Sequence, residues 1–99
     1  MKKLQLTEWN VLDYLGGEED IAAYLQAAAD ENDINYFLQA VGTVAKARSI
    51  NDMAQKMGVS RESLYKSFSG KTKPHFETVI KALDALGLRF YIAPKTQAA

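Results

Sequence analysis

The feature that most restricts the fold is a helical spacing of apolar side chains that glycines interrupt. From residue 18 to residue 87 apolar residues recur at intervals of three and four, the spacing of one face of an α-helix. Gly16 and Gly17, then Gly58, Gly70 and Gly87, break that spacing, because glycine has low helix propensity and suits the end of a helix. The pattern predicts an all-α chain of five or six short helices.

Three of these helices are expected before residue 50. The first covers residues 10–15, with Trp9 and Leu12 as apolar anchors. The second has Glu18, Glu19 and Asp20 in its first turn, where the helix dipole favours anions. Its apolar stripe is Ile21, Tyr24, Leu25 and Ala28. The third is capped by Asp33, carries Lys46 and Arg48 at its end, and has the apolar face Ile34, Phe37, Leu38, Val41, Val44 and Ala45.

The second half of the chain predicts three more helices. One covers residues 50–57 and breaks at Gly58, and the next is capped by Ser60 and runs through Ser69 to Gly70. The last starts with Pro74 at its first position, which suits a residue without a backbone N–H. Its apolar stripe is Phe76, Val79, Ile80, Leu83 and Leu86.

A short C-terminal β-strand is expected over residues 88–93, because Leu88 to Ile92 alternate apolar and amphipathic side chains. A lone strand has unpaired backbone groups, so it is expected to pair with residues 4–6 of its own chain or with the same strand of a second protomer. The length of 99 residues suits one domain. We divide it into an N-terminal arm over 1–17, the domain proper over 18–94 and a tail over 95–99.

The segment from residue 50 to residue 70 predicts a helix-turn-helix, that is, two short helices joined by a tight glycine-containing turn. Ala54 is small enough to let the second helix cross closely, and Gly58 can take the positive φ of the turn. Val59 is expected to fill the angle between the helices, while Leu64 and Phe68 hold the second helix to the core. A plain helical hairpin is the simpler alternative.

The exposed side of the second helix favours nucleic-acid binding over a plain hairpin. In a helix-turn-helix the N-terminal residues of the second helix contact base edges, while flanking residues contact phosphates. Arg61 can pair with a guanine and Glu62 with a cytosine amine, and the loop from Lys71 to Lys73 suits a phosphate. The candidate DNA-binding residues are Ser60, Arg61, Glu62, Ser63, Tyr65, Lys66, Ser69, Lys71 and Lys73, with Thr72 in the same loop.

The charges divide between the halves of the chain although the formal net charge is zero. Residues 1–40 carry two lysines and eight carboxylates, a net charge of −6, and residues 41–99 carry ten basic and four acidic residues, a net charge of +6. Such asymmetry indicates an anionic partner for the basic half and a cationic partner for the acidic half. Solvated helix faces are the simpler alternative.

Composition excludes several other classes. The chain has no cysteine and a single histidine, His75, so a disulfide framework and a cysteine- or histidine-based metal site are excluded, and no cofactor is expected. No apolar run approaches the roughly 18 residues that span a bilayer, so a cytoplasmic protein without a membrane partner is expected. No nucleophile with a neighbouring base is recognisable, which argues against an enzyme.

The chain resembles the bacterial addiction-module antidote proteins of the HigA-like helix-turn-helix type, which are related to the lambda-repressor fold. The resemblance extends from about Trp9 to Pro94 and depends on particular runs of residues. These are Leu12 to Leu15, Glu19 to Leu25, Gly58 to Lys66, Phe76 to Val79 and Leu86 to Arg89.

The resemblance implies a homodimeric antitoxin of a type II toxin-antitoxin module. Such a protein binds double-stranded operator DNA, represses its own operon and neutralises a co-encoded RelE/ParE-superfamily (HigB-like) toxin. The acidic half is then available to a basic toxin, and exposed aromatic residues suit an interface. The candidate toxin-binding residues are Trp9, Asp13, Tyr14, Glu18 and Glu19. Two alternatives remain: a stand-alone prophage-type transcriptional regulator of the same fold, and a protein-interaction module that binds no DNA.

Overall fold

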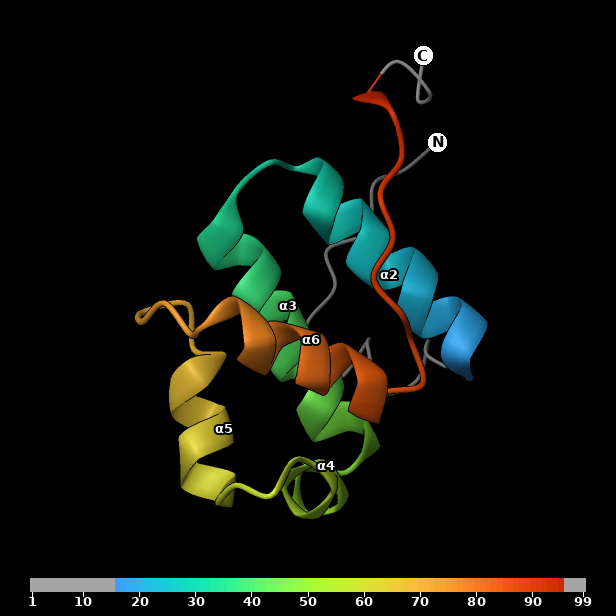
Figure 1. The fold of residues 1–99 in the computed structure, drawn as a ribbon. Coiled ribbons are helices and arrows are strands. Elements are labelled where there is room, and N and C mark those ends of the chain that lie inside the picture. The colour runs from blue at the N-terminus through green and yellow to red at the C-terminus, as the bar shows by residue number, and fades with distance from the viewer. Residues whose placement is uncertain (1–15, 96–99) are drawn as a thin grey trace.

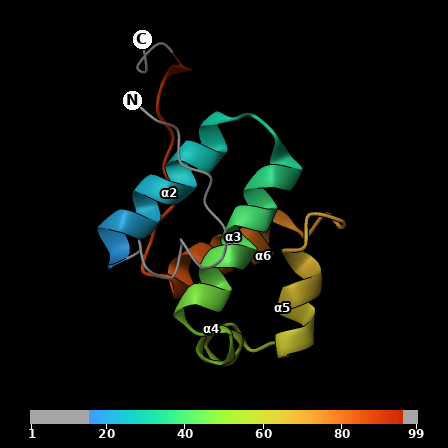
Figure 2. The same ribbon diagram turned by 180° about the vertical axis from the view of Figure 1, so that it is seen from behind.

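A computed structural model describes residues 16–95 and has five α-helices in that range (Figure 1). They are α2 (Glu18–Asp30), α3 (Ile34–Arg48), α4 (Ile50–Met57), α5 (Arg61–Ser67) and α6 (Phe76–Ala85). Helix α3 is central, because it packs against α2, α4 and α5, while α6 packs against α4 (Figures 1 and 2). The helix expected over residues 10–15 lies outside the described residues. None of the helices between residues 16 and 95 is long and apolar enough to cross a membrane.

The helix starts follow the expected capping pattern. The Asp33 side chain accepts a hydrogen bond from the backbone N–H of Tyr36 at 3.2 Å, which confirms Asp33 as the N-cap of α3. Helix α2 begins after Gly17 without a side-chain cap. Its first turn instead contains three carboxylates, which interact favourably with the positive N-terminal end of the helix dipole.

Gly58 and Gly87 end α4 and α6 as expected, but two predicted boundaries are wrong. Helix α6 closes with bonds from the N–H of Gly87 to Asp84 and of Leu88 to Leu83, a Schellman motif in which Gly87 takes φ = 84°. Helix α5 ends at Ser67, before the predicted Ser69. His75 is the N-cap of α6, so Pro74 precedes the helix and does not occupy its first position.

The core contains most of the residues of the predicted apolar stripes. Its buried residues are Ile21, Leu25, Ala28, Leu38, Ala40, Val41, Val44, Ala45, Met53, Ala54, Leu64, Phe68, Ala82, Leu83 and Leu86. Three residues that were expected to face inward are exposed instead: Ile34 (62%), Phe76 (64%) and Val59 (40%). Ile34 and Phe76 occupy the first positions of α3 and α6, so they lie at the ends of the predicted apolar faces.

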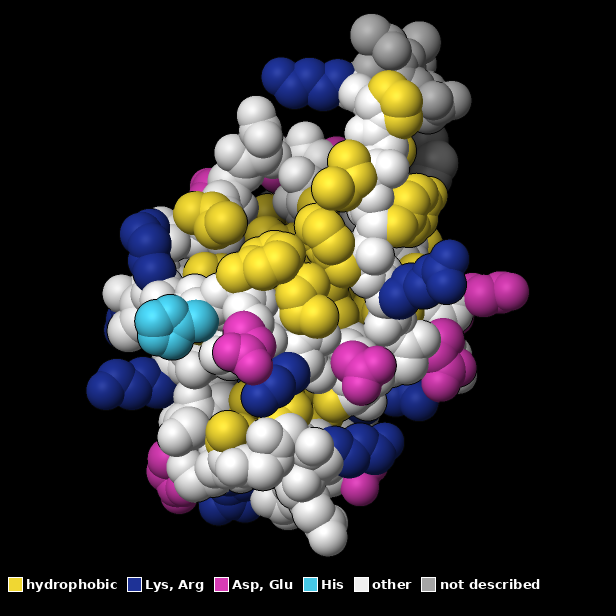
Figure 3. Space-filling view, in the orientation of Figure 1, with side chains coloured by type: hydrophobic (Ala, Val, Ile, Leu, Met, Phe, Trp, Pro, Cys, Tyr) yellow, Lys and Arg dark blue, Asp and Glu magenta, His cyan; other side chains and the backbone are white. Residues whose placement is uncertain are grey.

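The predicted strand over residues 88–93 is wrong, since this segment is neither helix nor strand. It leaves α6 and runs along α2 (Figures 1 and 2), and both line one groove. A strand requires a hydrogen-bonded neighbour, and no other β-segment exists between residues 16 and 95. The side chains therefore alternate as in a strand, but the backbone makes no strand-to-strand hydrogen bonds. Several of them remain uncovered, and they form part of an apolar area in Figure 3.

Candidate nucleic-acid interface

The turn between α4 and α5 consists of three residues, Gly58 to Ser60. Helix α4 ends with hydrogen bonds from the N–H of Val59 to Ala54 at 3.0 Å and of Gly58 to Gln55 at 3.2 Å. Gly58 adopts φ = 71° and ψ = 32°, and a Cβ there would meet nothing within 4 Å. Glycine is therefore favoured by the left-handed backbone and not by crowding. The turn lets α5 cross α4 steeply, since α4 is seen end-on in Figure 1 while α5 lies in the plane of the view.

The start of α5 is organised by two serines. The Ser60 Oγ accepts a hydrogen bond from the backbone N–H of Ser63 at 3.0 Å and donates to the Ser63 Oγ at 3.0 Å. This confirms Ser60 as the N-cap. The cap fixes the direction of the first turn of α5, and the side chains of Arg61 and Glu62 extend from this turn into solvent.

The inner side of α5 is held by α3. Leu64 and Phe68 are 2% and 4% exposed, as the sequence predicts. In addition, a Cβ on Gly42 of α3 would lie only 2.5 Å from the backbone oxygen of Phe68. The absence of a side chain at Gly42 therefore allows the end of α5 to approach α3 closely. Sequence reasoning missed this role, because nothing near Gly42 in the sequence indicates the distant Phe68.

The outer side of α5 presents the predicted polar set. Arg61, Glu62, Ser63, Tyr65 and Lys66 are all exposed. The Arg61 guanidinium donates a hydrogen bond to the Asn51 side chain of α4 at 3.4 Å. On the other flank the Lys46 ammonium lies 5.6 Å from the centre of the Tyr65 ring, a cation–π contact.

Asn51 and Lys46 are two polar neighbours of α5 that sequence reasoning missed. They lie ten and nineteen residues from their partners, and no local pattern links them.

The loop after α5 is ordered by its own hydroxyl groups. The hydroxyls of Ser69 and Thr72 both donate to the backbone oxygen of Lys66, at 3.1 and 2.8 Å. The backbone N–H of Lys71 donates to the Ser69 Oγ at 3.1 Å. These bonds satisfy a carbonyl at the end of α5 and hold the loop against the helix. Lys71 and Lys73 remain exposed, so two cations sit on a constrained loop beside the outer side of α5.

A groove of about 420 Å³ is lined by residues of both α3 and α5. Its lining combines the buried Leu64 and Phe68 with the exposed side chains of Lys46, Tyr65 and Lys71. Two ammonium groups beside a groove suit an extended polyanion, whose phosphates attract cations without regard to sequence.

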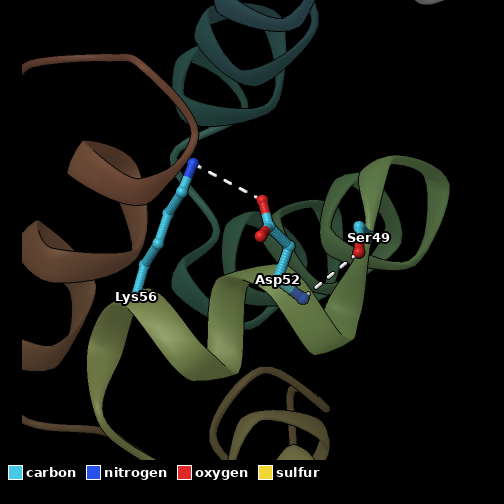
Figure 4. A network of polar contacts seen from close by, with 3 residues as sticks. All are labelled: Ser49, Asp52 and Lys56. Carbon is cyan, nitrogen blue, oxygen red and sulfur yellow. Dashed lines mark hydrogen bonds and ion pairs between the residues drawn. The ribbon is translucent and has the colours of Figure 1, made fainter.

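Helix α4 carries a smaller polar network (Figure 4). The Ser49 Oγ accepts from the Asp52 backbone N–H at 3.2 Å, which caps α4, and the Asp52 carboxylate pairs with Lys56 at 3.5 Å. The two charged side chains are 60% and 58% exposed, so the pair contributes little to stability.

The predicted toxin-binding residues are only partly described. Trp9, Asp13 and Tyr14 lie outside the described residues, whereas Glu18 and Glu19 are exposed in the first turn of α2. The Glu18 side chain lies close to Gly87, where an added Cβ would be 2.9 Å from its Cγ. Between residues 16 and 95 no cluster of three or more acidic or histidine side chains is placed to hold a metal ion.

Comparison with known proteins identifies the family. The family model described as "Probable addiction module antidote protein" matches residues 5–94. An uncharacterized protein of Haemophilus influenzae (strain KW20 / Rd) is 41% identical over 88 residues, which cover 89% of this chain and 91% of that protein. No solved structure matches the chain significantly. Since the family model covers nearly the whole sequence, the chain belongs to the probable addiction module antidote proteins.

Proposed function

We propose that this antidote protein is a DNA-binding antitoxin of a type II toxin-antitoxin module. In this proposal the segment from α4 to α5 is a helix-turn-helix of the lambda-repressor and HigA-like type within the domain over residues 18–94. The protein binds its own operator as a homodimer and represses its operon. The observation that carries the proposal is the outer side of α5, where an exposed arginine, a tyrosine and a lysine adjoin a loop with two exposed lysines.

The positions of the candidate residues support separate roles, base contacts for Arg61 and phosphate contacts for Lys71 and Lys73. Arg61 lies in the first turn of α5, the part of a recognition helix that reaches base edges in the major groove. An arginine there can make a bidentate pair with guanine. Lys71 and Lys73 lie on the loop beyond the far end of α5, where they meet the phosphate backbone and add affinity without sequence preference.

The same orientation of α5 on DNA assigns contacts to the remaining candidate residues. Ser60, Glu62 and Ser63 lie with Arg61 at the start of α5, so they face the bases or the edge of the groove. Tyr65, Lys66 and Ser69 lie one turn or more farther along and face the phosphates on either side.

Toxin neutralisation rests on the family and on the charge division. An addiction-module antidote acts on a toxin encoded with it, and we propose a basic toxin of the RelE/ParE superfamily, HigB-like. The acidic N-terminal half, with a net charge of −6 over residues 1–40, is the complementary surface. We place toxin binding on Glu18 and Glu19 of α2 together with Trp9, Asp13 and Tyr14.

DNA binding is tested by fluorescence anisotropy with the DNA upstream of the gene and with variants of each base pair. We expect half-sites about one helical turn apart. Arg61→Ala should weaken binding by roughly 1–3 kcal/mol and relax one base position, whereas Lys71→Ala should weaken all sequences alike and reduce the salt dependence by about one unit. If the two variants behave identically on all operator variants, Arg61 does not read a base.

Toxin neutralisation is tested by co-expression with the protein encoded beside this gene. We expect growth arrest by that protein alone and rescue by this chain, with both proteins copurifying. Growth arrest without rescue would contradict the antitoxin role. An operator-binding protein without a toxic neighbour would instead be a stand-alone regulator.

A further inference from the structure

A groove runs along α2 and is mostly apolar inside. Its volume is about 710 Å³, and it is lined by residues of α2, of α6 and of the segment after α6, which runs along α2 in Figures 1 and 2. The apolar lining includes Leu25, Phe37, Leu83, Leu88 and Phe90. Phe90 is 51% exposed, so part of this lining faces solvent.

Helix α2 contributes one whole face to the groove, from its first turn to its last. The contributing residues are Glu18, Glu19, Ala22, Leu25, Gln26 and Ala29. This face is about 16 Å long, since each residue of an α-helix adds about 1.5 Å. Leu25 is buried, whereas Ala22, Gln26 and Ala29 are exposed. The groove is therefore long enough to accept several residues of an added segment.

Residues 1–15 join the described domain at one end of this groove. The backbone N–H of Gly16 donates to the Asp20 carboxylate at 2.9 Å, which fixes the point where the chain enters α2. Glu18 and Glu19, two and three residues farther along, already line the groove. The chain before Gly16 therefore begins beside the groove and needs no linker to reach it.

The composition of residues 4–15 suits an apolar groove. Seven of these twelve residues are apolar or aromatic: Leu4, Leu6, Trp9, Val11, Leu12, Tyr14 and Leu15. Removing such side chains from water is favourable. Trp9 precedes Gly16 by seven residues, which span about 10 Å as a helix and up to about 23 Å when extended. Trp9 therefore reaches the groove in either conformation.

We propose that residues 4–15 bind in the groove along α2 of the same chain, with the Trp9 ring against its apolar lining. The chain bends at Gly17, and the segment before it runs back along α2. The occupant is thus a part of this chain, and neither a second copy nor another protein is needed to cover the groove.

Two arguments favour this segment over a separate partner. First, the segment is covalently joined to one end of the groove, so its effective concentration there is on the order of millimolar. Second, Arg89 lines the groove two residues after Gly87, and Gly87 lies beside Glu18 at the start of α2. A segment that runs back from Gly16 brings the Asp13 carboxylate to this end, whereas a strongly basic partner would be repelled by Arg89.

The proposal goes beyond the proposed function, and its test needs neither DNA nor toxin. Trp9 is also a proposed toxin contact, so a toxin that binds Trp9 would have to draw it out of the groove. The apparent affinity for the toxin would then fall with the fraction of chains whose segment is released. A failed fluorescence test leaves the proposed toxin contact untouched, and failure to bind a toxin leaves the fluorescence result untouched.

The test uses Trp9 as its own probe, because it is the single tryptophan of the chain. In the full-length protein its fluorescence emission should lie at shorter wavelength than in a peptide of residues 1–15. Acrylamide, a neutral quencher that added charges do not attract, should quench it severalfold less than in the peptide. Emission and quenching equal to those of the peptide would overturn the proposal.

A matched pair of variants locates the binding site of Trp9. Ala22→Lys places a charge in the groove, whereas Ala23→Lys places the same charge at the next exposed position of α2, which does not line the groove. Ala22→Lys should raise the quenching of Trp9 toward the value of the peptide, and Ala23→Lys should not. Both positions are exposed, so the helical circular dichroism spectrum should be unchanged. Equal quenching in the two variants would mean that Trp9 does not bind in the groove.

Dilution identifies the chain that supplies the segment. A contact within one chain does not depend on protein concentration, so the emission of the unmodified protein should stay constant when the protein is diluted. Emission that shifts to longer wavelength on dilution would assign the segment to a second copy and overturn the proposal.

Discussion

Gly42 lies inside α3, where alanine would normally be favoured. An alanine Cβ there would lie 2.5 Å from the Phe68 carbonyl oxygen and 3.3 Å from the Phe68 Cβ, so α3 and the end of α5 would have to separate. We expect Gly42→Ala to lower the free energy of unfolding by about 1–3 kcal/mol, the usual cost of overpacking. Urea denaturation measures this change.

The reverse substitution on α2 is the matched control for Gly42. Ala27 is exposed within α2, and Ala27→Gly should cost up to about 1 kcal/mol through helix propensity alone. Alanine would then be more stabilising than glycine at position 27 and less stabilising than glycine at position 42. Equal or greater stability of Gly42→Ala would mean that α5 moves away from α3 without cost.

Asn51 positions Arg61 in the proposed DNA complex. Its side-chain oxygen accepts from the guanidinium at 3.4 Å, so it restricts a side chain that must present two donors to one base. We expect Asn51→Ala to weaken operator binding by about 0.5–1.5 kcal/mol, the net value of one hydrogen bond. The measurement is anisotropy on the operator.

A double-mutant cycle separates positioning from an independent contact. Asn51→Ala should have no effect when Arg61 is already alanine, whereas an Asn51 that contacts DNA by itself would still matter. Gln55→Ala, at another exposed position of α4, is the control and should change nothing.

At the scale of single elements, α5 depends on its cap because it has only seven residues. So short a helix is not stable by propensity, and the bond from the Ser63 N–H to the Ser60 Oγ satisfies one of its free donors. Ser60→Ala should lower the free energy of unfolding by about 0.5–2 kcal/mol. Ser67→Ala, at the end of α5, removes a hydroxyl that makes no hydrogen bond between residues 16 and 95, and it should be nearly neutral. Equal losses would argue against the cap.

The Tyr24 phenol, on α2, makes the free energy of unfolding fall at alkaline pH. Burial raises the pKa of the Tyr24 phenol above 10.0, and the nearby Tyr36 adds to the rise. The folded state therefore keeps this proton when the unfolded state has lost it. Stability is full below pH 10 and falls as the pH rises through the folded pKa. Denaturation between pH 9 and 11 should show a smaller fall for Tyr24→Phe than for the unmodified protein.

The helices were predictable where their signals are local. Asp33 and Ser60 each bond an N–H three residues ahead, and Gly58 supplies a left-handed turn, so the neighbouring residues suffice. Exposure at Ile34 and Val59 was not predictable, because periodicity identifies a face without saying what covers it. The strand expected over residues 88–93 failed for a related reason, since alternation describes side chains whereas a strand also needs a partner.

The candidate site was predictable to the same extent. The exposed residues of α5 and of the loop with Lys71 follow from a helix of known start and phase. The contacts of Asn51 with Arg61 and of Lys46 with Tyr65 depend on how α4 and α3 cross α5. Crossing geometry is a tertiary property, so these neighbours appear only in the folded chain.

At the scale of the whole molecule, the division of charge leads to separate effects on the two proposed partners. Glu18 and Glu19 are exposed in the first turn of α2, outside the segment from α4 to α5, and should steer a basic toxin. Replacing both with lysine should slow toxin association, more strongly at low salt, because exposed charges are screened within a Debye length. Trp9→Ala should instead speed dissociation, because an aromatic side chain that contacts the toxin stabilises the complex after encounter. Surface plasmon resonance separates the two rates.

The control must carry the same change of charge at another place. Asp30→Lys reverses an exposed charge at the far end of α2, where a cation is favoured by the helix dipole. Glu19→Lys makes the same change at the start of α2 and should cost about 0.3–1 kcal/mol of stability as well, so folding is checked by thermal denaturation. If Asp30→Lys slows toxin association as much as Glu19→Lys does, the effect belongs to the overall charge. A slower rate for Glu19→Lys alone, with operator binding unchanged, would place the docking surface at the start of α2.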